Sequence, residues 1–245
     1  MSRLQRWRTG LGRWLILMVL TGFLFEILVV TRVALTRWID PQSTTYQRSQ
    51  MWQLFLAKLP FEWHHQWVPL SRIHPHLQRA VIASEDDAFV DHNGVRWDSV
   101  EQAWRKNERA QARASDPLKA KLVGGSTLTQ QLAKNLWLSG ERNLARKAQE
   151  LVIAYALETF VSKSRILELY LNSVEWGRGT FGAESAALRH FGVSAQHLDR
   201  VQAARLAVLL PRPRVYERNL EGSSYLNERA FTILARMTQA RLPKP

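Results

Sequence analysis

The residue best suited to acid–base chemistry is Glu85, near the end of a predicted helix. One face of this helix is marked by residues that recur at helical intervals: Leu77, Val81, Ser84 and Ala88. Glu85 directly follows Ser84, so we expect its carboxylate to point toward the packed side rather than into open water. Burial raises the pKa of a carboxyl group, which suits a general base or acid near neutral pH. Spacing alone leaves a plainer alternative open, an acidic helix end followed by a loop.

A second polar segment, GGSTLTQQLAKN at residues 124–135, is suited to bind an anion. Gln130 and Lys134 are four residues apart, so they share a helical face, and Gln131 lies beside Lys134. Lysine supplies positive charge and the amides supply directed hydrogen bonds. This combination predicts an oxyanion or phosphate site.

A helix must carry these side chains, and the sequence indicates where it begins. Thr127 and Gln130 have the spacing of a capping box, in which each side chain bonds the other residue's backbone N–H. A buried stripe is predicted at Leu128, Leu132 and Leu136. The helix is expected to break at Ser139 and Gly140.

The next predicted helix, residues 143–162, carries a further charged pair. Arg146 and Glu150 are four residues apart and meet on one face, and Arg142 joins them if the helix begins early. A pair of this kind is most often a surface salt bridge that stabilises by a few tenths of a kcal/mol. Spacing alone therefore leaves a functional role undecided.

The rest of the chain also predicts helices, and no alternating strand pattern of convincing length occurs. Ser164 is expected to cap a helix, and further helices are predicted at residues 183–191, 201–210 and 227–237. Residues 172–182, NSVEWGRGTFG, read as a shaped loop because of their three glycines. Within it Glu175 and Arg178 are candidate substrate contacts, although a packed turn is favoured for Glu175. The expected fold is mainly α.

Composition narrows the class of protein. With 245 residues and 46% hydrophobic content, the chain can bury a core, and one catalytic domain with a small appendage is expected. The net charge of +13 favours anionic partners, namely nucleic acid, anionic lipid head groups or phosphorylated substrates. The absence of cysteine excludes disulfides and thiolate metal sites. Ten tryptophans, together with the excess of basic residues, indicate a protein that lies at a membrane interface.

Residues 14–31 form an apolar stretch that predicts one transmembrane helix. Eighteen helical residues rise roughly 27 Å, close to the hydrocarbon thickness of a bilayer. The excess of arginine before this stretch predicts a cytoplasmic tail at residues 1–13 and an exported body. A cleaved signal peptide is the alternative, but no clean cleavage site follows. Glu26 within the span is costly if charged, and a helix–helix contact in the membrane is one hypothesis for it.

Two further segments suggest contact with lipid. Residues 32–70 connect the span to a domain at residues 71–245, and their many aromatic side chains could lie at the membrane interface or pack on the domain. Residues 101–121 are polar and basic, and they predict a mobile segment or a solvated helix face. Anionic lipid head groups are a secondary hypothesis for the partner of this run.

Five ordered segments resemble the motifs of the family 51 glycosyltransferases, the peptidoglycan polymerases. They are SEDDAFVDHNG, GGSTLTQQLAKN, RKAQE, ILELYLNSVEWGRGTFGAESAALRHFG and QAARLAVLLPRP. The resemblance extends over residues 71 to about 240. Neither an SxxK nor a KTG motif occurs, which indicates the monofunctional form rather than a bifunctional penicillin-binding protein. The resemblance implies a lysozyme-like helical domain with a smaller flexible lobe near the membrane.

The resemblance also implies roles for individual residues. Glu85 is implied to be the general base, and Glu150 is assigned to a second site that handles the donor diphosphate. Lys134, Arg142 and Arg146 are implied to hold that diphosphate. The expected catalytic residues are therefore Glu85, Glu150 and Lys134. Whether Glu150 also holds a divalent cation, Mg or Mn, that binds the diphosphate is left open. No cofactor is expected to be obligatory.

Other polar residues of the motifs are expected to contact substrate: Gln130, Gln131, Asp86, Ser126 and Thr127. The implied reaction transfers a growing undecaprenyl-diphosphate-linked glycan chain onto the 4-hydroxyl of lipid II, with inversion and release of undecaprenyl diphosphate. The implied partners are these lipid-linked glycans, the bacterial inner membrane and division or elongation proteins, and not nucleic acid. The catalytic domain is expected on the periplasmic side.

Two other classes of protein remain as alternatives. A glycan-cleaving hydrolase would also place a glutamate on a helix, but it would not need the cations at Lys134, Arg142 and Arg146. A membrane-tethered binding protein would not need a buried Glu85. Turnover of lipid II discriminates between all three.

Overall fold

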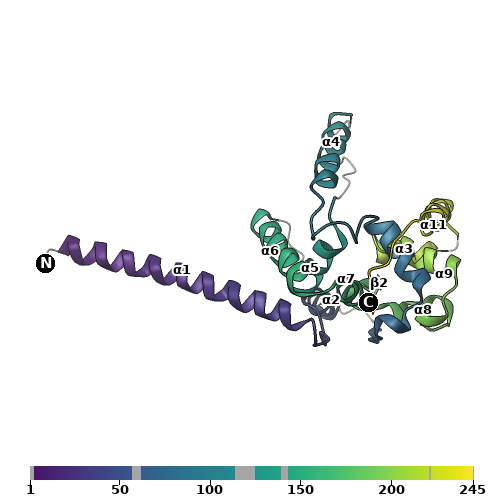
Figure 1. Cartoon of the computed structure of the whole chain (residues 1–245), viewed down its shortest axis with the longest axis horizontal. Coiled ribbons are helices and arrows are strands. Elements are labelled where there is room, and N and C mark those ends of the chain that lie inside the picture. Colours follow the sequence, from purple (N-terminus) through teal and green to yellow (C-terminus); the bar gives the residue numbers. More distant parts are fainter. Residues whose placement is uncertain (1–2, 57–61, 114–124, 139–142, 221, 245) are drawn as a thin grey trace.

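A computed structural model describes residues 3–56, 62–113, 125–138, 143–220 and 222–244 of the chain. Helices dominate, which confirms the predicted mainly α fold (Figure 1). The body is built around α3 (Pro75–Glu85), α5 (Leu128–Trp137), α6 (Leu144–Phe160), α7 (Lys163–Ser173) and α9 (Arg200–Leu209). The remaining helices are α1 (Arg3–Leu35), α2 (Thr45–Leu56), α4 (Trp97–Arg113), α8 (Ala183–Phe191), α10 (Pro213–Tyr216) and α11 (Ser224–Arg236). Short 3₁₀ turns lie at Leu70–Arg72, Ala195–His197 and Glu217–Asn219.

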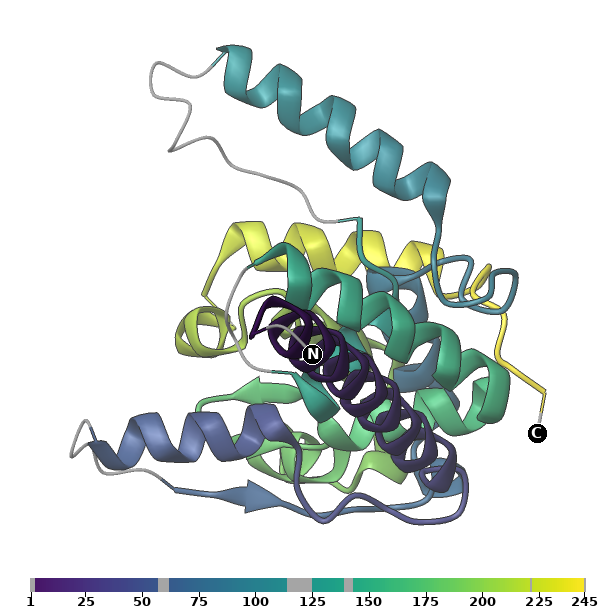
Figure 2. The ribbon, with the colours of Figure 1, turned by 90° about the vertical axis from the view of Figure 1, so that its left-hand side faces the viewer.

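The N-terminal helix α1 extends away from the body (Figure 1). Its segment Gly12–Leu35, with a mean hydropathy of 2.3, is long and apolar enough to cross a membrane. This length and hydropathy are compatible with a single-pass membrane anchor. The segment extends beyond the predicted residues 14–31 at both ends. Seen along α1, helices α2 and α4 lie across the direction of the anchor (Figure 2).

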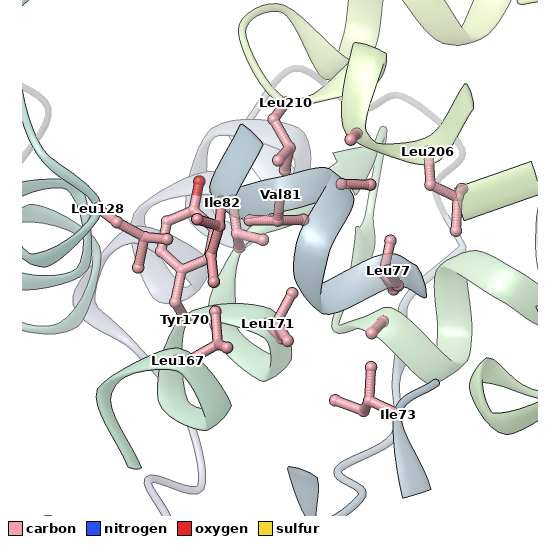
Figure 3. Packing of buried hydrophobic residues seen from close by; sticks show 14 of the residues in the cluster. Ile73, Leu77, Val81, Ile82, Leu128, Leu167, Tyr170, Leu171, Leu206 and Leu210 are labelled. Atoms are coloured by element: carbon pink, nitrogen blue, oxygen red, sulfur yellow. The ribbon is translucent and has the colours of Figure 1, made fainter. Parts of the chain in front are cut away.

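The core forms around α3. Its residues Leu77, Val81 and Ile82 are almost fully buried, and α3 packs against α9 and α11. Figure 3 shows α3 between leucines of α9 on one side and Leu128 and Tyr170 on the other. Because Glu85 is the last residue of α3, the packing of this helix fixes where the carboxylate lies.

Helices α5 and α6 pack on each other and begin with polar caps. The predicted capping box is confirmed, because Thr127 Oγ1 accepts from Gln130 N at 3.2 Å and Gln130 Oε1 accepts from Thr127 N at 3.0 Å. The leucine stripe of α5 is buried as expected. Helix α6 is capped by Asn143, whose side chain accepts from the backbone N–H of Arg146 at 2.7 Å.

One predicted cap is wrong by two residues. Helix α7 is capped by Ser162, which accepts from the backbone N–H of Arg165, rather than by Ser164. Ser164 lies in the first turn, with its hydroxyl 3.0 Å from that of Ser162. Both serines satisfy the composition rule for a cap, but Ser162 has the extended backbone of a cap residue, with φ −65° and ψ 153°, whereas Ser164 already lies within α7.

The predicted loop at residues 172–182 contains short strands. Strands β1 (His64–His65), β2 (Glu175–Gly177) and β3 (Thr180–Phe181) form a three-stranded sheet in the order β1-β3-β2 within the described part of the chain. Strands of two or three residues are too short to show alternation. Gly179 makes the turn with a φ of +70°, and a Cβ there would collide with the carbonyl oxygen of Glu62.

The described residues of the segment 38–70 make polar contacts with the domain. Tyr46 donates to Glu175 Oε2 at 2.9 Å, and Thr45 donates to the carbonyl oxygen of Leu136 at 3.0 Å. Glu175 is buried and also accepts from Arg214 Nε at 2.8 Å, so the packed role favoured for it is confirmed. Burial raises the pKa of Glu175, which these hydrogen bonds oppose. Trp52 and Phe55 on α2 remain exposed.

The basic run predicted as a mobile segment or a solvated helix includes α4. This helix projects from the body (Figure 1) and exposes Trp97 and Trp104 as well as its charges. The end of the run, residues 114–121, lies outside the described residues.

Candidate active site

Glu85 accepts hydrogen bonds from two neutral groups. Gln131 Nε2 donates to Oε2 at 3.0 Å, and Ser84 Oγ donates to Oε1 at 3.2 Å. Burial raises the pKa of Glu85, and these two hydrogen bonds, which favour the ionised form, oppose it only in part. The raised pKa expected from the sequence is therefore confirmed.

Gln131 is held in place by a buried tyrosine. The hydroxyl of Tyr170 on α7 donates to Gln131 Oε1 at 3.0 Å, which leaves the amide nitrogen facing Glu85. Tyr170 is fully buried, and its pKa is raised by burial first and then by the carboxylates of Glu85 and Asp86. The tyrosine therefore remains a hydrogen-bond donor, and α3, α5 and α7 together orient the carboxylate of Glu85.

Asp86 and the residues at the start of α5 make contacts within the protein. Asp86 accepts from the backbone N–H of Leu128 at 2.9 Å and from His92 Nε2 at 2.9 Å. Thr127 Oγ1 donates to the carbonyl oxygen of Gly94 at 2.6 Å, and Gln130 is buried in the capping box. These contacts join α3 to the first turn of α5. Substrate contact by Asp86, Thr127 and Gln130 stays a prediction.

The second carboxylate, Glu150, is surrounded by cations. Arg146 Nη1 donates to Glu150 Oε2 at 2.9 Å, and Lys147 Nζ donates to Oε1. The side chains of Arg146 and Glu150 are only 16% and 4% exposed, so the pair is buried and not a surface salt bridge. Lys147 Nζ also donates to Ser126 Oγ at 3.2 Å. We call Ser126, Arg146, Lys147 and Glu150 the Glu150 cluster.

A small pocket lies beside Glu85. It has a volume of about 120 Å³ and is lined by Glu85, Asp86, Arg96, Ser99 and residues 125–127. Ser126 lines this pocket and bonds Lys147 of the Glu150 cluster. Ser126 is therefore the link between the pocket beside Glu85 and the cations of the Glu150 cluster.

Two further cations predicted for the diphosphate site, Lys134 and Arg142, are not part of the Glu150 cluster as described. Lys134 lies in the last turn of α5, is partly exposed, and belongs to the helix that packs on α6. Arg142 lies outside the described residues.

Sequence reasoning missed Lys147 and Tyr170 as members of the site. Lys147 stands in the segment RKAQE three residues before Glu150, a spacing that also places two side chains on one helical face. Nothing in the local pattern around Tyr170 distinguishes it from a core residue. Its partner Gln131 is 39 positions away in the sequence.

The residues of the Glu150 cluster do not fit the predicted metal. Each carboxylate oxygen of Glu150 accepts a hydrogen bond from a cation, which leaves it poorly suited to bind a second positive charge. Among the described residues, no group of three His, Cys, Asp or Glu side chains has the arrangement of a metal site.

Comparison with known proteins assigns the family. Residues 53–238 match the family model described as transglycosylase. The chain is 45% identical to a biosynthetic peptidoglycan transglycosylase of Burkholderia vietnamiensis, over 99% of this chain and 98% of that protein. Proteins with the same name from Bordetella avium and Herminiimonas arsenicoxydans are 43% and 47% identical, over 99% and 94% of this chain and 99% and 96% of their own lengths. The chain therefore belongs to the transglycosylase family, as the five ordered motifs predicted, and it is a glycosyltransferase.

Proposed function

We propose that this enzyme polymerises the glycan strands of peptidoglycan. It would transfer a growing undecaprenyl-diphosphate-linked glycan chain onto the 4-hydroxyl of lipid II, with inversion and release of undecaprenyl diphosphate. The observation that carries the proposal is that Ser126 links two unlike carboxylates. Ser126 lines the pocket that contains Glu85, whose pKa is raised, and it accepts a hydrogen bond from Lys147 beside Glu150. The names of the relatives, biosynthetic peptidoglycan transglycosylases, support the substrate class.

Glu85 acts as the general base in this proposal. Its carboxylate removes the proton of the acceptor 4-hydroxyl as the oxygen attacks the anomeric carbon of the donor sugar. A raised pKa makes Glu85 a stronger base than an exposed glutamate, while the hydrogen bond from Gln131 keeps the carboxylate oriented. The new glycosidic bond forms as the bond to the diphosphate oxygen breaks, and the anomeric centre inverts.

The cations of the Glu150 cluster would stabilise the negative charge of the leaving diphosphate. Negative charge builds on the departing diphosphate, and preorganised cations stabilise it without reorganising. Arg146 Nε is buried and has no hydrogen-bond partner among the described residues, so this guanidinium has donor capacity left for an anion. Glu150 would hold Arg146 and Lys147 in place, and Lys134 and Arg142 would add to the same charge.

A membrane anchor formed by α1 would place the reaction next to its lipid-linked substrates. The proposed topology has residues 1–13 in the cytoplasm and the catalytic domain on the periplasmic face of the inner membrane. An anionic lipid substrate also agrees with the net charge of +13.

Turnover of lipid II by the detergent-solubilised full chain tests this function. The wild type is expected to produce polymeric glycan, whereas cleavage of a preformed glycan strand without polymerisation would indicate the hydrolase instead. Glu85→Gln is expected to abolish polymerisation, because an amide cannot accept the proton. Glu101→Gln, which removes a carboxylate from an exposed ion pair on α4, serves as the control. Full activity of Glu85→Gln would exclude the general-base role.

A further inference from the structure

The anchor helix α1 is not a free tether, because its last turns pack on the catalytic domain. Val33 is fully buried within the core, and Val29 and Val30 are partly buried against it. Glu26 continues this line at helical spacing, whereas Phe25 and Ile27 on either side of it are 57% and 47% exposed. We call Glu26, Val29, Val30 and Val33 the docking stripe. These last turns of α1 pack on α6.

The outermost residue of the docking stripe makes a polar contact with α6. Gln149 Nε2 donates to Glu26 Oε2 at 3.2 Å, over a sequence separation of 123 positions. Glu26 lies within Gly12–Leu35, the segment able to cross a membrane. Carboxyl groups inside such segments are rare and costly and almost always face a partner rather than lipid. The amide of Gln149 supplies that partner.

The partner helix is also the one that carries the cations. Gln149 directly precedes Glu150, and Arg146 and Lys147 lie one turn earlier on α6. A helix transmits a displacement along its axis as a nearly rigid body, so docking of α1 at Gln149 also places the Glu150 cluster relative to the anchor. The diphosphate of a membrane-bound substrate lies at a fixed depth in the bilayer, so the height of these cations above the membrane matters.

We propose that Glu26 is a positioning residue that docks the membrane anchor on α6 and so sets the Glu150 cluster at the depth of the substrate diphosphate. The role assigned to this docking rests on the proposed function. The docking itself does not, so the two are tested separately.

The docking is tested by cross-linking. The chain contains no cysteine, so cysteine pairs can be introduced without removing any native residue. The pair Glu26→Cys and Gln149→Cys, in membranes, is expected to be joined within one chain by a short bis-maleimide. The pair Leu24→Cys and Gln149→Cys is the matched control, because Leu24 is 63% exposed and lies off the docking stripe. Equal cross-linking of the two pairs, or none of the first, would overturn the docking.

The positioning role is tested by kinetics in liposomes containing lipid II. Glu26→Leu is expected to raise the KM for lipid II about threefold, the scale of one interhelical hydrogen bond in a membrane, with a smaller change in kcat. Glu26→Gln keeps an acceptor oxygen and is expected to restore the wild-type KM. Thr21→Leu, which also removes a polar group from the anchor, at an exposed position, is the control.

The double variant Glu26→Leu with Gln149→Leu separates this role from a general effect of either substitution. If the two residues act through one hydrogen bond, the double variant has the KM of Glu26→Leu alone. A wild-type KM for Glu26→Leu, or additive effects in the double variant, would overturn the positioning role. Failure of the wild type to polymerise lipid II would instead contradict the proposed function, and the cross-linking result would still decide the docking.

Discussion

Glu85 and Glu150 are the same residue type in opposite surroundings. Glu85 accepts hydrogen bonds from an amide and a hydroxyl, neither of which carries charge, and burial raises its pKa. Glu150 is buried as well, but its two oxygens accept from Arg146 and Lys147. A buried carboxylate with a raised pKa is suited to accept a proton, whereas a carboxylate bonded by two cations fixes the positions of those cations. The neighbours, and not the residue type, distinguish the two proposed roles.

The largest expected difference between the two sites is in how much a substitution lowers the free energy of unfolding. Glu150→Leu leaves Arg146 and Lys147 without their buried counter-charge, so the free energy of unfolding should fall by about 3 kcal/mol. Glu85→Gln keeps the size of the side chain and removes a charge that burial disfavours, so it should lower the free energy of unfolding by no more than about 1 kcal/mol, the scale of one neutral hydrogen bond. Denaturant unfolding in detergent measures both. Equal losses for the two variants would contradict the contrast.

Removal of a cation should mainly affect the chemical step. Lys147→Met is expected to lower kcat by about 100-fold, the usual cost of losing one preorganised donor to a developing negative charge. Lys147→Arg should recover part of this loss, because it keeps the charge. Lys106→Met, an exposed lysine on α4, is the control in the same lipid II assay. A loss confined to KM would mean that Lys147 binds substrate and transition state equally.

The support of Glu85 by Gln131 should appear in the pH profile. A general base works when deprotonated, so activity is lost as the pH falls through the pKa of Glu85. The hydrogen bond from Gln131 favours the ionised form and holds this pKa down, so Gln131→Leu should move the acid limb of kcat toward higher pH. At alkaline pH the variant should approach the wild-type rate. An unmoved acid limb would show that Gln131 does not act on the pKa of Glu85.

The smallest effect on the pH profile is expected from Tyr170, which contacts Gln131 rather than Glu85 itself. Tyr170→Phe removes the donor that orients Gln131 and leaves the amide free to turn its oxygen toward Glu85. The acid limb should move in the same direction as for Gln131→Leu, but less, because the correct amide orientation stays partly populated. In the variant that combines both changes, Tyr170→Phe should add no further shift. An additive shift would show that Tyr170 acts on Glu85 by its own route.

The two sites also differ in how far the sequence predicts them. The position of Glu85 beside the packed face of a helix and its raised pKa follow from the spacing of apolar residues in α3. For Glu150, spacing predicts the contact with Arg146 but favours an exposed pair. Whether a helical face is buried depends on which elements pack against it. The helices α1 and α5 both pack on α6, and the spacing of residues within α6 does not indicate this.

What the sequence by itself determined is local. The capping box at Thr127 and the buried leucine stripe of α5 follow from residues within a few helical turns, the apolar anchor follows from one continuous stretch, and each motif is a contiguous segment. Only the tertiary structure decided which side chains meet across long separations. Gln131 reaches Glu85 over 46 positions, Tyr170 reaches Gln131 over 39, and Gln149 reaches Glu26 over 123. Such contacts follow from how the helices pack, and no local pattern specifies which residue of one helix will face a given residue of another.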